Sequence, residues 1–166
     1  MRYDQSSGSG AGKLINQTDQ DSLAQIFKEY GEERLASRIA KSIKEMTIMN
    51  TIADLREAIR RCTPPNHRDR TFARIFQALR IAVNQELGIL EQFLTKFIDF
   101  LRPGGRIVII SYHSLEDRLV KHSFKKLASG GTLDILTKRP ITATEKERKK
   151  NRRARSAKLR AAVKVT

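Results

Sequence analysis

The sequence of 166 residues contains no tryptophan, a single cysteine and few aromatic residues, which make up 6% of the chain. One cysteine, Cys62, excludes an internal disulfide and a multi-cysteine metal site, and we predict no metal site. No apolar run approaches the roughly 20 residues that a membrane-spanning helix needs. The first dozen residues are polar, without the apolar core of a signal peptide. We therefore expect no membrane partner and a cytoplasmic location.

Acidic residues are scarce in the second part of the chain. Residues 1–60 carry nine Lys or Arg and nine Asp or Glu, whereas residues 61–166 carry 24 against nine, which accounts for the whole net charge of +15. A basic part beside a neutral part favours a polyanionic partner, most simply nucleic acid. The competing interpretation is a solvated basic surface, and at this magnitude we rank nucleic-acid contact above it.

The first 16 residues are predicted to form a loop. This segment superficially matches a phosphate-binding loop, but Ser7 stands where the motif needs glycine and Leu14 where it needs Ser or Thr. After it, apolar residues recur at helical spacing in three amphipathic segments. These segments are residues 19–30, 35–46 and 51–62. Residues 64–70 are a polar break, so we place a domain boundary there, between residues 1–68 and 69–166.

Residues 71–101 form the longest periodic stretch. Nine apolar positions from Phe72 to Leu101 advance 29 residues in eight steps, an average of about 3.6, the α-helical period. Gly88 is a candidate point for a kink or a split into two helices. Arg80, near the middle, is a candidate for ligand contact, although periodicity alone favours a solvated face.

A β-branched run, residues 107–110, follows the turn formed by Pro103, Gly104 and Gly105. Such a run predicts a strand buried on both faces, as in a parallel sheet. Ser114 with Asp117 three residues later has a capping-box pattern, so a helix is expected to begin there. In open α/β sheets, ligands bind beyond the carboxyl ends of strands. We therefore expect chemistry or recognition at residues 112–118.

The segment 145–160 holds nine Lys or Arg against two Glu. A disordered basic tail is one interpretation. However, apolar and basic residues alternate from Ala157 to Lys164, which predicts an edge strand with basic side chains on its open face. Arginine binds phosphate through two hydrogen bonds and stacks on bases. This segment is our first choice for RNA contact.

Several motifs together resemble the ribosomal RNA small-subunit methyltransferase H family. FQALRIAVNQEL (76–87), LRPGGRIVIISYHSLEDRLVK (101–121) and NRRARSAKLR (151–160) are similar to its second half. MRYDQSSG (1–8) and YGEERLASRIAKSI (30–43) resemble its middle. The resemblance covers nearly the whole chain, in the family's order.

The resemblance implies an α/β fold and an activity. Members use S-adenosylmethionine to methylate N4 of a cytidine in small-subunit ribosomal RNA, through a class I, Rossmann-like domain into which a helical domain is inserted. Residues 1–68 would then be most of the helical insert, for substrate recognition. Residues 69–166 would be the returning, C-terminal half of the methyltransferase domain. Small-subunit ribosomal RNA, or the ribosomal subunit, would be the partner.

The sequence also departs from that family. It has no Gly-rich turn between a strand and a helix, and no acidic residue about 20 positions beyond one. We therefore assign no cofactor-binding residue to this chain and expect those residues in an upstream half. The alternative is a non-catalytic, basic RNA-binding remnant, and a weaker one is a nonfunctional truncated product. Without its first strands, the apolar run 107–110 would be an exposed edge, which predicts self-association.

Methyl transfer to an exocyclic amine needs acceptors that orient the amine and a group that takes its proton. By the resemblance, His113, Glu116 and Asp117 are candidates for this proton, and Tyr112 for stacking on a base that has left its stack. The alternatives are helix capping for Asp117, a favourable helix-dipole position for Glu116, and simple packing for Tyr112. The candidate RNA-binding residues are Arg80, Arg118, Arg152, Arg153, Arg155, Lys158 and Arg160.

Overall fold

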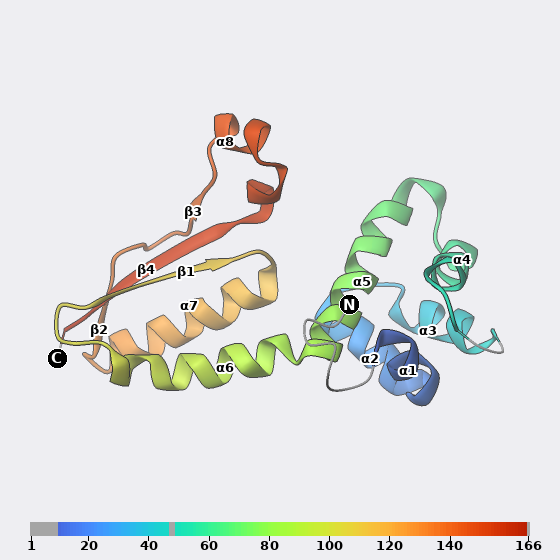
Figure 1. Ribbon diagram of the computed structural model, residues 1–166, viewed down its shortest axis with the longest axis horizontal. Coiled ribbons are helices and arrows are strands. Elements are labelled where there is room, and N and C mark those ends of the chain that lie inside the picture. The colour runs from blue at the N-terminus through green and yellow to red at the C-terminus, as the bar shows by residue number, and fades with distance from the viewer. Residues whose placement is uncertain (1–9, 47–48, 166) are drawn as a thin grey trace. The chain divides into compact units, whose positions relative to one another are not determined.

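A helical unit and a unit built on a β-sheet make up the fold (Figure 1), and they divide between Glu86 and Leu87. The structure is a computed structural model, and it describes residues 10–46 and 49–165. None of the described helices is both long enough and apolar enough to cross a lipid bilayer.

The first unit is built from helices around one apolar core. The helices are α1 (Ala11–Gln17), α2 (Gln20–Gly31), α3 (Ala36–Lys44), α4 (Ile52–Cys62), the 3-10 turn η1 (Pro65–His67) and α5 (Arg68–Asn84). Asp19 caps α2 by accepting a hydrogen bond from the Ser22 N–H, and Thr51 caps α4 in a reciprocal box with Asp54. The three helices predicted before residue 64 are thus confirmed. Their core includes Leu23, Phe27, Ile39, Ile59, Ile75 and Leu79.

The loop predicted for residues 1–16 is wrong over its second part. Residues 1–9 lie outside the described residues, but α1 begins at Ala11. Its residue Ile15 is buried in the helical core, and its carbonyl accepts a hydrogen bond of 2.6 Å from the Lys44 ammonium group. Tertiary packing therefore imposes a helix where the local Ser/Gly-rich composition favoured a loop.

The long periodic stretch is interrupted at Gln85 and not at Gly88. Gln85 has φ of 51°, in the left-handed region, and its N–H bonds to the Ile81 carbonyl, which ends α5. Gly88 lies inside the next helix, α6 (Glu86–Lys96). Because α5 packs in the helical core, the two units divide at 86/87, whereas the sequence placed a boundary at 68/69. The apolar positions of one continuous helical period thus pack into two separate cores. The spacing of these positions does not show where one core ends and the other begins.

The second unit is a mixed α/β arrangement. Its elements after α6 are η2 (Phe97–Phe100), β1 (Arg106–Ser111), α7 (Ser114–Ser129), β2 (Leu133–Ile135), β3 (Ile141–Thr142), α8 (Glu145–Lys150), η3 (Arg152–Ser156) and β4 (Lys158–Lys164). The sheet has the order β1-β4-β2, with β3 also paired to β4, and every pairing is antiparallel. Helix α7 packs on one face (Figure 1), with Phe124 against Phe97 in the core. Strand β2 is short, with three residues.

Strand β1 is buried on one face only, so the prediction of burial on both faces is wrong. Ile107 and Ile109 pack against the core beneath α7, whereas Val108 is 57% exposed and Ile110 51% exposed. The β-branched residues therefore indicate a strand, which they favour on either face of a sheet. They do not indicate that a second layer covers the outer face. Within the described residues β1 pairs with β4 alone, so the expected apolar edge is confirmed.

Strand β4 forms where the alternation predicted a strand, but it is not an edge. It lies between β1 and β2, and the basic side chains are on the covered face rather than the open one. Arg160 is 6% exposed beneath α7, and Lys164 donates to the Ile98 carbonyl at 3.1 Å. Arg160 lies on the covered face because the Asp117 carboxylate on α7 accepts its hydrogen bond there.

Candidate functional site

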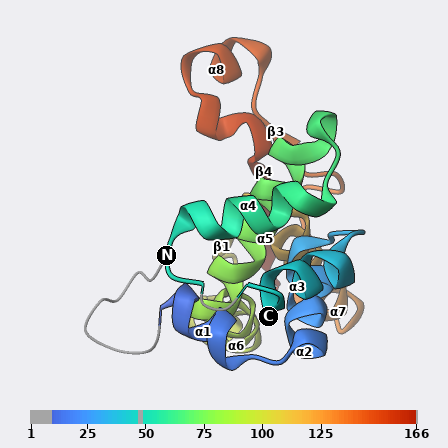
Figure 2. The ribbon, with the colours of Figure 1, turned by 90° about the vertical axis from the view of Figure 1, so that its right-hand side faces the viewer.

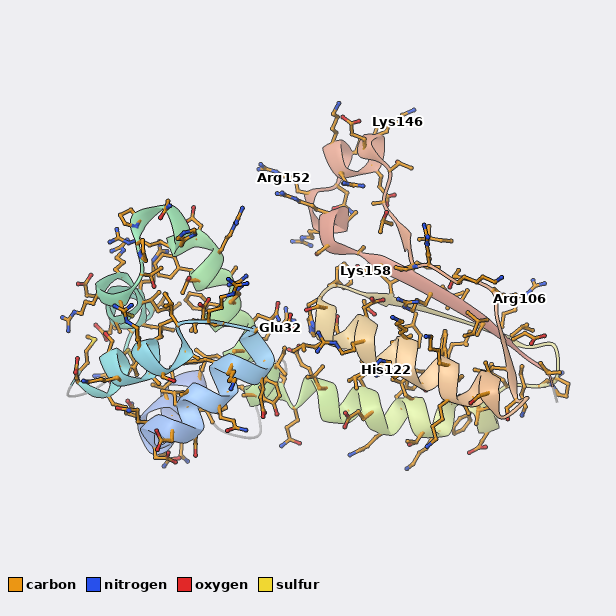
Figure 3. The ribbon with its side chains drawn as sticks, turned by 180° about the vertical axis from the view of Figure 1, so that it is seen from behind. Glu32, Arg106, His122, Lys146, Arg152 and Lys158 are labelled. Atoms are coloured by element: carbon orange, nitrogen blue, oxygen red, sulfur yellow. The ribbon has the colours of Figure 1, made fainter. Side chains whose placement is uncertain are left out.

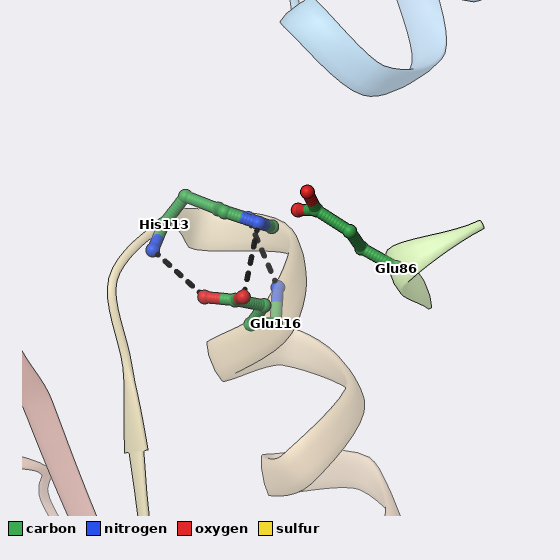
Figure 4. Close-up of side chains that lie close together, drawn as sticks. All are labelled: Glu86, His113 and Glu116. Carbon is green, nitrogen blue, oxygen red and sulfur yellow. Dashed lines mark hydrogen bonds and ion pairs between the residues drawn. The ribbon is translucent and has the colours of Figure 1, made fainter. Parts of the chain in front are cut away.

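The carboxyl end of β1 carries the residues in which the sequence predicted chemistry. His113 is the N-cap of α7, and its Nδ1 accepts a hydrogen bond of 3.3 Å from the Glu116 N–H. In return, the Glu116 carboxylate accepts the N–H groups of Tyr112 at 2.8 Å and of His113 at 3.2 Å. Figure 4 shows the ring and the carboxylate joined in this cap. The capping box is therefore His113 with Glu116, and the expected pair Ser114 with Asp117 is wrong by one residue.

The cap fixes the ionisation of Glu116 and the tautomer of His113. Burial raises the pKa of Glu116, but its contacts with the His113 ring and two backbone N–H groups outweigh burial and lower this pKa below its ordinary value. Because His113 Nδ1 accepts a hydrogen bond, the neutral ring carries its proton on Nε2. Within the described residues, Nε2 has no hydrogen-bond partner. This nitrogen is itself buried and lies 3.3 Å from Glu116 Oε1, so both ring nitrogens face the cap.

Asp117 is committed to a buried ion pair. Its Oδ1 accepts from Arg160 Nε at 2.7 Å and its Oδ2 from Arg160 Nη2 at 3.2 Å, while the Lys158 ammonium lies 3.5 Å from Oδ2. Burial raises the pKa of Asp117, but Arg160 and then Lys158 outweigh burial and lower it. A carboxylate so held links α7 to β4.

Replacing His113 by alanine is expected to destabilise the second unit by about 1 kcal/mol, because the first turn of α7 loses the acceptor for the Glu116 N–H. Replacing it by asparagine, a good N-cap residue, is expected to restore most of this loss. Urea unfolding followed by circular dichroism measures both changes. Equal stability of the alanine and wild-type chains would show that the cap contributes nothing.

Tyr112 and Ser111 lie beside this cap with contrasting exposure. The Tyr112 side chain is 54% exposed, as stacking on a base would require. Ser111 is 2% exposed, and its Oγ has no hydrogen-bond partner among the described residues. No local pattern distinguishes Ser111, since a serine that ends an apolar strand gives no signal of its burial.

The candidate RNA-binding residues divide into exposed and internal groups. Arg152, Arg153 and Arg155 are exposed on η3, beside α8, and Figures 1 and 2 show α8 projecting beyond the sheet. In Figure 3, Lys146 and Arg152 extend from this projection. We call residues 146–155 the basic projection. Lys158 and Arg160, in contrast, face the Asp117 carboxylate.

Two further candidates lie outside the basic projection. In the first unit, Arg80 binds Glu86 through both Nε and Nη2, at 2.9 and 3.0 Å, so its guanidinium is largely engaged. Arg118 is exposed on the first turns of α7. Within the second unit, the structure therefore does not bring its six candidates onto one surface, since Lys158 and Arg160 face Asp117.

The residues at the end of β1 do not form a cofactor cradle. Within the described residues of this turn, β1 leads through Tyr112 and His113 directly into α7, without glycines that would let a backbone approach a ligand. The side chains of His113 and Glu116 serve the cap.

Comparison with known proteins gives the family. The model of the MraW methylase family matches residues 1–165. The chain belongs to this family. It is 50% identical to the ribosomal RNA small subunit methyltransferase H of Crocosphaera subtropica over 163 residues, covering 96% of this chain and 51% of that protein. The proteins of the same name from Synechocystis sp. and Trichormus variabilis are 49% and 52% identical, each over 99% of this chain and 54% of their own length.

The chain thus spans about half the length of the curated relatives it matches. The family likeness found in the motifs at 76–87, 101–121 and 151–160 is confirmed. These motifs become α5 with the start of α6, β1 with α7, and η3 with the start of β4.

Proposed function

We propose that this chain is the C-terminal half of an S-adenosylmethionine-dependent enzyme that methylates N4 of a cytidine in small-subunit ribosomal RNA. The observation that carries the proposal is the family match across residues 1–165, together with relatives named ribosomal RNA small subunit methyltransferase H. On this proposal the second unit belongs to a Rossmann-like domain, and the first contains the helical insert. The free edge of β1 is where further strands of such a sheet would pair.

The cap at the end of β1 positions the residue that faces the substrate in this proposal, Tyr112. Glu116 and Asp117 have lowered pKa values and internal partners, which makes both poor proton acceptors. Their roles are to hold the cap and to join α7 to β4. Tyr112, which is exposed, is suited to stacking on a cytosine ring. His113 Nε2, in contrast, is buried 3.3 Å from Glu116 Oε1. His113 thus orders the turn that presents Tyr112 to the base.

Calorimetric titration of S-adenosylmethionine tests this proposal. The chain alone is expected to bind no cofactor, while the chain mixed with the upstream half of a family member is expected to bind it and to methylate small-subunit RNA. Binding by the chain alone would overturn the assignment of the cofactor site to other residues. Failure of both, with retained RNA binding, would favour the alternative, a basic RNA-binding protein without catalysis.

The basic projection is the proposed RNA-binding surface. Replacing Arg152, Arg153 and Arg155 together by glutamine is expected to weaken binding of single-stranded RNA and to reduce the slope of log affinity against log salt by about 2, since each lost phosphate contact removes roughly 0.7. Fluorescence anisotropy at several salt concentrations measures the slope. A matched variant, with the exposed residues Lys96, Arg102 and Lys126 replaced, distinguishes a local surface from general charge. Equal losses in both variants would contradict a local site.

Self-association through the edge of β1 is also expected for the isolated chain. In the part of the chain that the structure describes, this edge of β1 pairs with no other strand, and Val108 and Ile110 beside it are exposed. Such an edge favours pairing with a second copy. Replacing Val108 by lysine is expected to reduce association, because an edge charge opposes sheet extension. Light scattering across a range of concentrations measures the mass. A clean monomer of the unaltered chain at high concentration would contradict this expectation.

A further inference from the structure

A cleft between α7 and β2 lies inside the second unit and has no role in the function proposed above. Its volume is about 370 Å³, near the lower end of the 300–1,000 Å³ range that is usual for small-molecule sites. Its apolar surface comes from Ala128 on α7 and from Leu133 and Ile135 on β2. Such a surface can pack against a flat ring, but it has no polar group that would fix the orientation of the ring.

Three lysines give the cleft a charge of one sign. Lys121 and Lys125 lie one turn apart on α7, and Lys138 follows β2. Within the described residues, none of the three ammonium groups has a hydrogen bond or an ion pair, in contrast to Lys158 at 3.5 Å from Asp117. Asp134 is the single acid among the described lining residues, and strand alternation with Leu133 and Ile135 directs it to the other face of the sheet. The open lysines therefore favour a phosphate.

Arg160 adds a donor at the inner end of the cleft. Its Nε and Nη2 donate to Asp117, which holds the guanidinium in place at 6% exposure. Among the described residues its Nη1 has no hydrogen-bond partner, although Arg160 lines the cleft. A fixed guanidinium with a remaining N–H fits a carbonyl or ring nitrogen of a base.

We propose that this cleft binds one nucleotide of an RNA strand, with its base over Ala128, Leu133 and Ile135, a ring acceptor on Arg160 Nη1, and its phosphate between Lys121, Lys125 and Lys138. The inference rests on the RNA substrate of the proposed function and assigns it a second contact, apart from the basic projection and the end of β1. The chemistry of a free nucleotide is the same, so the test separates the two sources.

Nuclear magnetic resonance of the full ¹⁵N-labelled chain tests the site, with cytidine 5′-monophosphate as probe. The amides of residues 121–128 and 133–138 are expected to shift, more strongly than with cytidine or inorganic phosphate at equal millimolar concentration. A short single-stranded RNA is expected to shift the same amides at lower concentration and to displace the nucleotide. No shift of these amides with the nucleotide overturns the site, and a shift with the free nucleotide but not with RNA overturns its assignment to RNA.

Two variants locate the site. Replacing Lys121 and Lys125 together by glutamine is expected to weaken nucleotide binding at least about tenfold, because two charge-assisted contacts are lost. The matched double variant of Lys96 and Lys126, which lie on the helices of this unit outside the cleft, is expected to leave binding unchanged. Ala128→Phe, which fills the apolar part, is expected to abolish binding while the spectrum stays dispersed.

Equal binding by the glutamine variant and the wild type would overturn the proposal, as would binding that persists when Ala128→Phe fills the cleft. None of these measurements uses S-adenosylmethionine or methyl transfer. Nucleotide binding without methylation by the assembled halves would reject the proposed function but support the site. Methylation without nucleotide binding at the cleft would reject the site alone.

Discussion

Replacing Asp117 by alanine is expected to lower the free energy of unfolding of the second unit by about 3–5 kcal/mol, because it leaves the Arg160 guanidinium buried without its counter-charge. Both side chains are close to fully buried, and two hydrogen bonds join them. Urea unfolding at neutral pH, followed by circular dichroism, measures the change.

An exposed ion pair provides the matched control. Glu145 and Lys149 lie 2.9 Å apart on α8, with side chains 82% and 76% exposed. Glu145→Ala is expected to change stability by less than about 0.5 kcal/mol, since water screens such a pair. Asp117→Leu combined with Arg160→Met is expected to recover most of the loss, because no buried charge remains. A cost for Asp117→Ala as small as that for Glu145→Ala would show that water reaches the pair.

Acid should remove the same stabilisation. The pKa of Asp117 is lowered in the folded chain, since Arg160 and Lys158 outweigh the effect of burial. Between this lowered value and the ordinary value of about 3.9, the unfolded chain binds a proton that the folded chain does not. The stabilisation is therefore complete above about pH 5 and declines as the pH falls further. The stability difference between wild type and Asp117→Asn is expected to shrink over this interval, and a constant difference would contradict the assignment.

Local signals in the sequence located most elements of the second unit but not the direction of their side chains. The alternation from Ala157 to Lys164 predicted β4, yet it placed the basic residues on the open face. The correct choice depends on Asp117, 43 residues from Arg160 in the sequence, and no local pattern contains that contact. The period of two in a strand shows which residues share a face, but it does not show which face is covered and which is exposed to solvent.

The sequence predicted the position of the candidate site better than the roles of its residues. The end of the apolar run before Tyr112 marked the carboxyl end of β1, and an N-cap was expected within one residue of its position. The box was assigned to Ser114 because Ser is a preferred N-cap residue, whereas histidine is an unusual one. In the same way, the periodicity from Phe72 to Leu101 correctly predicted helix. It did not predict the end of α5, because the residue with the left-handed conformation there is Gln85, and not the Gly or Asn that usually marks a helix end.

Replacing Phe124 by alanine is expected to destabilise the second unit by about 3–5 kcal/mol and to leave the first unit nearly unchanged. Phe124 is 1% exposed, and its ring centroid lies 6.1 Å from that of Phe97 in the core of the second unit. Phe27, fully buried in the helical core, provides the matched variant for the first unit.

Hydrogen exchange of backbone amides, resolved along the chain, distinguishes the two outcomes. Phe124→Ala is expected to accelerate exchange within residues 87–165, and Phe27→Ala within residues 10–46 and 49–86, because separate cores open separately. Acceleration of both ranges by either variant would mean that the units unfold as one, so that the break at Gln85 is a bend in a single cooperative structure. Separate responses would mean that α5 and α6 belong to different folding units, although one helical period runs through both.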